Sequence, residues 1–258
     1  MPPKATSLYF ATLRRDLSVL TQRRLFWWAL ALWSAICTLV FFSYLESFLD
    51  IQPQLRAKNF RYGVTDLVMM PYVKALGLVA MLFVIGLCSR LFFNEHFSAF
   101  GVLYRSANPR PLPLLAAKWG YVAGMALTLV GLLALPPLVS RFFFDFHLSR
   151  VILTLLAQFV LLFSVGMLAA VLSQVFRHSI LVMLTACLAI GLPELAVRLI
   201  AEPAWLLPVL EFFSALAHSN RIATGVITLS DGVYFLLWWW LLSAIAQRQF
   251  NNTYLLSS

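Results

Sequence analysis

The residues best suited to binding another molecule lie in one polar stretch, from Phe93 to Lys118, between two long apolar runs. Glu95 and Arg105 offer charges, and Gly101 has no Cβ, so another backbone can approach it closely. Aromatic side chains of the kind that anchor protein interfaces recur along the same stretch. They are Phe97, Phe100 and Tyr104, after which Pro109 and two further prolines turn the chain back. The pattern predicts a short surface helix, between Glu95 and Ala117, that docks a soluble partner.

Residues for catalysis or metal binding do not form a recognisable set. The phosphate-binding pattern Gly-x-x-x-x-Gly-Lys does not occur, so an ATP site of that kind is not expected in this chain. A metalloprotease pattern such as His-Glu-x-x-His is also missing, and the histidines stand apart from one another: His96, His147, His178 and His218. The cysteines fall in apolar runs, where a thiol behaves as a small hydrophobic group: Cys37, Cys88 and Cys187. We expect no catalytic residue, metal or cofactor in this chain.

The composition indicates an integral membrane protein, because 62% of the 258 residues are hydrophobic, 11% are charged and the mean hydropathy is +0.86. Apolar runs long enough to cross roughly 30 Å of hydrocarbon recur six times. They cover about 25–44, 70–90, 119–139, 151–171, 179–199 and 232–245. We therefore expect an all-α, polytopic fold with a single domain over 1–258. The net charge of +9 is scattered over the span ends, which argues against a nucleic-acid partner.

The distribution of basic residues predicts the orientation of the chain. The segment before the first span carries five basic residues and one acid, whereas the loop between Glu46 and Met70 carries three of each. The segment from Arg90 to Lys118 is again basic, with Glu95 as its acid. Because cytoplasmic loops are enriched in Lys and Arg, both termini and the docking stretch are expected on the cytoplasmic side of the membrane.

Two segments outside the spans are expected to form short helices. Residues Thr6 to Arg24 place Phe10, Leu13, Leu17 and Leu20 at helical spacing, which predicts an amphipathic helix in the membrane interface. Its basic residues can reach anionic lipid headgroups, and they either form a solvated flank that only sets the topology or belong to a helix that docks beside a partner protein. The segment from Ala201 to Ser230 is apolar but broken by prolines, and we expect one or two short helices on the outer face.

One acidic residue, Glu194, falls near the end of an apolar run, with Arg198 one helical turn later. An ionised carboxylate inside the bilayer costs a few kcal/mol, and a partner at i+4 relieves part of that cost. The sequence leaves two interpretations open. Either Glu194 and Arg198 pair within the bundle, or both reach the outer headgroup region separately.

Two stretches resemble ABC-2 type transporter permeases. In that family a Glu precedes a Gly, a Pro follows eight residues after the Gly, and a Lys opens the third span; Glu95, Gly101, Pro109 and Lys118 stand at these places. The C-terminal stretches Phe212 to His218 and Gly225 to Phe235 are similar to the family's Ser-Pro-x-x-His-Phe and Gly-x-Ile-x-Leu-x-Asp-x-x-Tyr-Phe. Together they resemble the branch concerned with gliding motility and nitrous-oxide-reductase maturation.

The resemblance implies a function. It implies a transmembrane permease subunit of an exporter, which pairs with a second permease subunit, alike or different. A separate ATPase would bind ATP and Mg²⁺ and push on the stretch from Glu95 to Ala117, so that this chain is not itself an enzyme. Two other classes stay open: a membrane enzyme, which needs polar residues converging from different spans, and a membrane scaffold, which needs neither feature.

Overall fold

The computed structural model describes residues 5–22, 24–57, 63–92, 111–144, 146–199 and 206–255. This part of the chain is helical and contains no strand. Its elements are α1 Ala5–Thr21, α2 Arg24–Ala57, the π-helix η1 Thr65–Met69, α3 Met70–Cys88, α6 Pro111–Ser140, α7 Leu148–Val175, α8 Ser179–Leu199, α9 Leu206–Phe213, α10 Ala215–Ala223 and α11 Leu229–Leu255. Six helices in these ranges are long and apolar enough to cross a membrane, so the all-α, multi-pass fold is confirmed.

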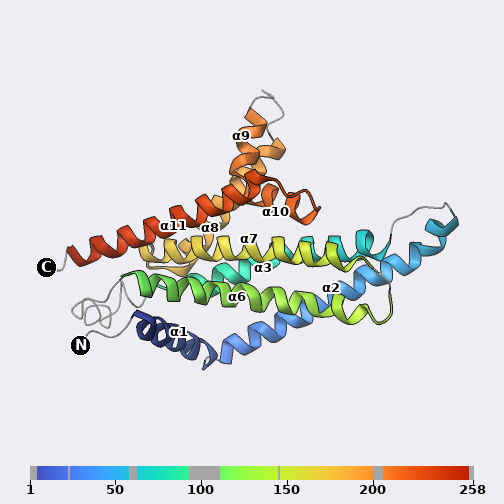
Figure 1. The fold of residues 1–258 in the computed structure, drawn as a ribbon. Coiled ribbons are helices and arrows are strands. Elements are labelled where there is room, and N and C mark those ends of the chain that lie inside the picture. Colours follow the sequence, from blue (N-terminus) through green and yellow to red (C-terminus); the bar gives the residue numbers. More distant parts are fainter. Residues whose placement is uncertain are drawn as a thin grey trace.

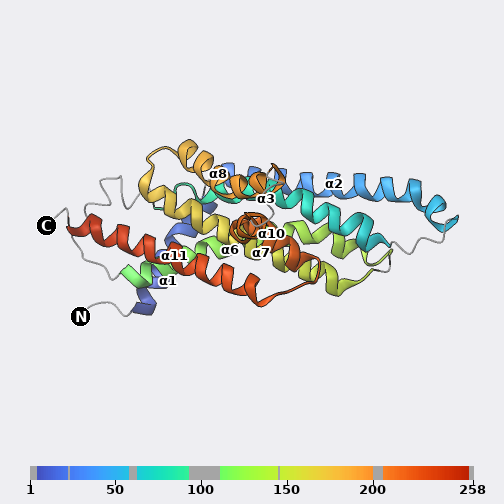
Figure 2. The same cartoon turned by 90° about the horizontal axis from the view of Figure 1, so that it is seen from above.

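Helix α7 forms the centre of the bundle and contacts α3, α6, α8, α10 and α11 (Figures 1 and 2). Its sequence allows this close packing because small residues lie along it. A Cβ added at Gly166 would lie 2.6 Å from Val122 Cγ1 of α6 and 3.5 Å from Cys88 Sγ of α3. Ala169 and Ala170 are fully buried. The small residues of this span therefore let three helices approach one another.

A Gly166→Ala variant is expected to lose about 1–3 kcal/mol of stability, because the added methyl group overpacks the contact with Val122. Gly131→Ala in α6 is the matched control, since a Cβ there has no neighbour within 4 Å. Unfolding by SDS in mixed micelles gives both free energies. If the two variants unfold at the same SDS fraction, the close approach at Gly166 is wrong.

Hydrogen bonds to backbone carbonyls tie two spans to α6. Trp33 of α2 donates from Nε1 to Leu129 O at 3.2 Å, and Tyr72 of α3 donates its hydroxyl hydrogen to Leu133 O at 3.0 Å. Both aromatic side chains are fully buried. Because a buried polar group without a partner is costly, these bonds fix which face of α2 and of α3 points at α6.

Several helices are longer than the apolar runs that predicted them. The run 25–44 lies in a helix that continues to Ala57, the run 119–139 in one that starts at Pro111, and the run 232–245 in Leu229–Leu255. Polar residues such as Glu46 end an apolar run but do not break a helix, whose backbone bonds are satisfied internally. Pro111 suits the first turn, where an N–H would have no helical partner. The run 179–199 agrees with α8 at both ends.

Helix α1 packs on α6 and crosses the end of that helix at an angle (Figures 1 and 2). Leu13, Leu17 and Leu20 pack against the bundle as their spacing predicts, whereas Phe10 is 66% exposed. Gly120 of α6 makes room for this helix, because a Cβ there would lie 2.7 Å from the Tyr9 hydroxyl oxygen. The amphipathic pattern of α1 thus buries its leucines against protein.

The expected short helices before the last span are present as α9 and α10. Helix α10 packs along α7, and α9 projects from the side of the bundle (Figure 1). The start of α1 and the end of α11 lie at the same end of the bundle as the turn between α7 and α8 (Figure 1). We call this the termini end, and the opposite end, where α6 passes into α7, the far end.

Candidate functional site

Residues 93–110 of the predicted docking stretch are outside the described part of the chain, whereas residues 111–117 form the first turns of α6 and not, as the sequence predicts, part of a separate surface helix. Its proposed contact residues therefore stay predictions: Glu95, Phe97, Phe100, Gly101, Tyr104, Arg105 and Pro109. The structure does describe the two ends of the stretch, the last turn of α3 and the first turns of α6. Lys118 of α6 joins these two ends, because its side chain contacts Leu91 and Phe92 just after α3.

Lys118 is 1% exposed and joins three elements. Its Nζ lies 2.8 Å from Asp16 Oδ2 of α1, donates a 3.0 Å hydrogen bond to Leu91 O after α3, and sits 5.6 Å above the Phe92 ring. Asp16 is 11% exposed, so the ion pair is largely shielded from water. Lys118 belongs to α6, and its ammonium group contacts α1 and the residues that follow α3, so movement at either end of the stretch is tied to α1.

A Lys118→Met variant keeps the apolar stem but removes the charge, and we expect it to cost about 1–3 kcal/mol, because Leu91 O loses its hydrogen-bond donor and Asp16 loses the cation of its ion pair. Arg14→Met on the exposed side of α1 removes a charge without such contacts and is the control. Limited proteolysis of the membrane-embedded protein should cleave near Asp16 faster in the Lys118 variant only. Equal cleavage rates would mean that the ion pair does not hold α1 in place.

The second site lies where α10 meets α11, and three local motifs build it. Ser214 caps α10 by accepting a 3.1 Å hydrogen bond from Ala217 N. Gly225 follows α10 with φ of +91°, and its N–H and the next one bond back to Ile222 O and Arg221 O. This is a helix end that favours glycine. These two motifs set the length of α10 and the turn after it.

The third motif starts α11. Thr228 donates from its backbone N and its hydroxyl to Asp231 Oδ2, at 3.0 and 2.6 Å, so that Asp231 caps the helix from its third position. A carboxylate at this place satisfies a free backbone N–H and also lies at the positive end of the helix dipole. Asp231 is thereby held with its other oxygen facing α10.

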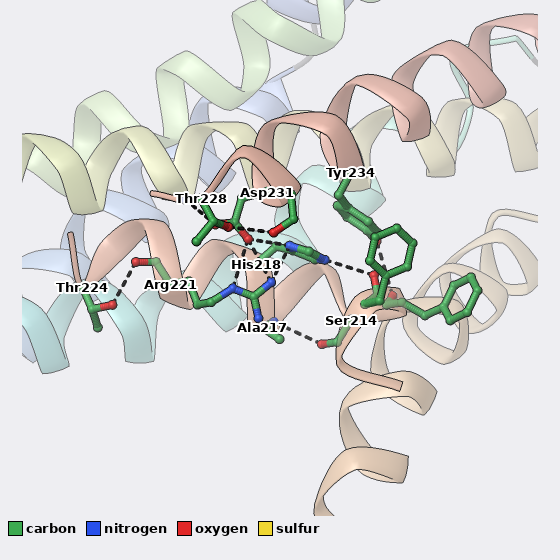
Figure 3. A network of polar contacts seen from close by, with 11 residues as sticks. Ser214, Ala217, His218, Arg221, Thr224, Thr228, Asp231 and Tyr234 are labelled. Atoms are coloured by element: carbon green, nitrogen blue, oxygen red, sulfur yellow. Dashed lines mark hydrogen bonds and ion pairs between the residues drawn. The ribbon is translucent and has the colours of Figure 1, made fainter. Parts of the chain in front are cut away.

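The other carboxylate oxygen of Asp231, Oδ1, contacts the side chains of two residues of α10, His218 and Arg221 (Figure 3). His218 Nδ1 lies 2.6 Å away, and Arg221 donates from Nε at 3.0 Å and from Nη2 at 2.9 Å. Asp231 is 0% and His218 1% exposed, whereas the Arg221 side chain is 33% exposed. We call His218, Arg221, Thr228, Asp231 and Tyr234 the α10–α11 network. Its buried carboxylate is compensated by a neighbouring cation and by hydrogen bonds.

The His218 ring is fixed on its other sides as well. It stacks on Tyr234 with ring centroids 4.1 Å apart, and its Nε2 lies 3.0 Å from Phe212 O. Tyr234 donates its hydroxyl hydrogen to Phe213 O at 3.3 Å. His218 stands apart from the other histidines of the sequence, and its partners are instead Asp231, Tyr234 and the Phe212 carbonyl. In a nucleophilic triad the second ring nitrogen would face a hydroxyl or thiol, but here it faces a backbone carbonyl, so the arrangement joins helices rather than activates a nucleophile.

Glu194 connects α8 to this region. Its Oε2 accepts a 3.0 Å hydrogen bond from Ser214 Oγ, the residue that caps α10. Arg198 lies in α8, but its side chain is outside the described part, so the predicted pair of Glu194 and Arg198 stays a prediction. Sequence reasoning missed the bond to Ser214 because it considered only partners on the same helix.

Comparison with protein-family models, with curated proteins and with solved structures finds no match for this chain. The site must therefore be interpreted from its own geometry. Its clearest feature is that the two C-terminal stretches identified in the sequence meet: His218 and Ser214 belong to the first, and Gly225, Asp231 and Tyr234 to the second. The spacing Thr228-x-x-Asp231 could have been recognised in advance as a helix cap.

Proposed function

We propose that this chain is the permease subunit of an ATP-binding cassette transporter, most simply an exporter. The observation that supports the proposal most strongly is the α10–α11 network. The residues that carry the C-terminal resemblance to ABC-2 type permeases each have a structural role in it: Ser214 and Asp231 cap helices, Gly225 ends one, and His218 packs between Asp231 and Tyr234. A chance likeness in sequence would not require these residues to meet.

The environment of Lys118 is a second support. Lys118 is the described member of the other resembling stretch, and its contacts join α1 and both ends of residues 93–110. A push on that stretch by a docked ATPase would therefore reach α1, α3 and α6 together. In this mechanism the chain moves substrate by rocking its spans, and no residue of the chain acts chemically on ATP.

The complex that we propose has two permease subunits, alike or different, and two ATPase subunits that bind ATP and Mg²⁺. It lies in the inner membrane of a bacterium, with the termini end of the bundle in the cytoplasm. The test is reconstitution in nanodiscs with the ATPase encoded by a neighbouring gene. The pair should hydrolyse ATP in a Mg²⁺-dependent reaction, whereas the permease alone should not. Failure of that ATPase to bind would contradict the proposal.

The orientation can be tested separately by cysteine labelling of intact cells, in a background without the native cysteines. Ser149 lies exposed in the first turn of α7 at the far end, Thr224 lies exposed directly after α10, and His178 lies exposed in the turn at the termini end. We expect an impermeant maleimide to label Ser149→Cys and Thr224→Cys and to spare His178→Cys until the cells are opened. Labelling of His178→Cys in intact cells would reverse the orientation.

A further inference from the structure

The two ring nitrogens of His218 have different surroundings. Nε2 lies 3.0 Å from Phe212 O, which can only accept a hydrogen bond, so the hydrogen of a neutral ring belongs on Nε2. Nδ1 lies 2.6 Å from an acceptor, Asp231 Oδ1, and 2.7 Å from a donor, Arg221 Nη2. Nδ1 therefore has a choice of two hydrogen bonds, and the protonation of the ring decides which of them forms.

The two protonation states of His218 give Asp231 different cations. In the neutral ring Nδ1 carries a lone pair and accepts from Arg221 Nη2, and Arg221 is the cation next to the Asp231 carboxylate. In the protonated ring Nδ1 carries a hydrogen, which it donates to Asp231 Oδ1. The imidazolium is then the cation next to Asp231, and the Arg221 guanidinium lies beside a like charge.

Burial determines which of the two cations can leave. Asp231 is 0% and His218 1% exposed, whereas the Arg221 side chain is 33% exposed. One cation beside the buried carboxylate forms a neutral pair, but two cations leave a net charge away from water, which is costly. Because Arg221 reaches solvent, it can turn to water when His218 takes up a proton. The exchange keeps the buried pair neutral in both states.

The other contacts of the network hold the ring and the carboxylate in place during this exchange (Figure 3). The His218 ring stacks on Tyr234, with ring centroids 4.1 Å apart and an interplanar angle of 14°. Thr228 donates twice to Asp231 Oδ2, so His218 and Arg221 compete for the other oxygen, Oδ1. Movement is therefore expected at Arg221 and not at the ring.

Within the described residues, His218 forms no hydrogen bond or ion pair with any charged group except Asp231 and Arg221. Lys74 of α3 lines a cavity of about 240 Å³ between α3, α7, α8 and α10. The other charged residues on helices around α10 are Glu194 of α8, Glu211 of α9 and Arg150 of α7. The competition for Asp231 Oδ1 is thus local to the α10–α11 network.

We propose that the α10–α11 network is a proton-operated switch, in which a proton on His218 replaces Arg221 at Asp231 and releases the guanidinium group to water. Histidine is the side chain that ordinarily changes its charge between about pH 5 and 8. The switch therefore responds to the pH of the compartment that Arg221 faces, and at low pH it exposes a positive charge beside the turn at Gly225. It does not depend on the permease proposal.

NMR spectroscopy of the protein in nanodiscs, with ¹⁵N-labelled histidine and arginine, tests the switch between about pH 5 and 9. A His218→Asn variant identifies the His218 signals by their loss. As the pH falls, we expect Nδ1 of His218 to gain a hydrogen while Nε2 keeps its own. The Arg221 Nε–H signal should change with the same midpoint.

An Arg221→Met variant should raise the midpoint of His218 protonation by about 1–3 pH units, because the competing cation is removed from beside the ring. Arg150→Met is the control, since Arg150 pairs with Asp66 and not with the network. It should leave the midpoint unchanged.

Every other outcome contradicts the switch. A ring that keeps the same number of hydrogens over the whole pH range would mean that Nδ1 does not change its partner. Protonation of His218 without a change at Arg221 would mean that the guanidinium group stays at Asp231. An unchanged midpoint in Arg221→Met would mean that the two cations do not compete. If that variant does not fold, the titration of the parent protein still decides, because it compares His218 and Arg221 directly.

Discussion

An Asp231→Asn variant is expected to lose about 3 kcal/mol of stability, the lower end of the range for breaking a buried ion pair. The amide cannot serve both sides of the network: if its oxygen accepts from His218 and Arg221, its N–H₂ faces the backbone N–H of Thr228, which is also a donor. The loss is at the lower end because the Arg221 side chain is one-third exposed and can turn to water. SDS unfolding in mixed micelles measures the effect.

The control for this variant is Asp50→Asn, which removes the same charge from an exposed position on α2. It should unfold like the parent protein. The start of α11 should also become more accessible to water in Asp231→Asn, since the carboxylate that accepts the hydrogen bonds of Thr228 is lost. If Asp231→Asn and Asp50→Asn are equally stable, the α10–α11 network does not hold these helices together.

A Gly101→Trp variant is expected to insert and fold normally but to lose ATPase association and stimulated ATP hydrolysis almost completely. The reason is that Gly101 lies among the charges and aromatic anchors of the predicted docking stretch, where a Trp side chain would prevent close approach of another backbone. Pull-down of the ATPase at matched membrane expression measures association, and phosphate release measures turnover.

Gly131→Trp is the control, because Gly131 lies on an exposed face of the span α6, far in sequence from the docking stretch. It should keep both activities. If Gly101→Trp recovers as much ATPase as the parent protein and turns over ATP normally, the aromatic residues around it only rest on lipid. The stretch would then have no part in the mechanism.

The spans were predictable from the sequence because hydrophobicity alone decides which residues can cross a membrane. Helix ends were predictable only where a local feature stops the helix. Helix α8 agrees at both ends, whereas α2 continues past Glu46 and Asp50 to Ala57, because polar side chains are compatible with helical backbone outside the apolar layer. The two short helices α9 and α10 were expected from the prolines that interrupt an apolar stretch.

The polar contacts between helices could not be predicted in the same way. His218 and Asp231 meet because Gly225 and Thr228 define a particular turn between α10 and α11, which sets one helix against the other. Lys118 meets Asp16 only after α1 has packed on α6. Lys74 offered a sequence signal, a basic residue within an apolar run, but its cavity needs four helices to be in place.

The proposed function is tested most directly by purifying the tagged chain from the membranes of its own cells in a mild detergent. We expect an ATPase containing Gly-x-x-x-x-Gly-Lys to purify with it, in about equal amount, and we expect the complex to hydrolyse ATP in the presence of Mg²⁺. If the chain is instead recovered without any such ATPase, under conditions in which its spans stay folded, it is not a permease subunit of this class.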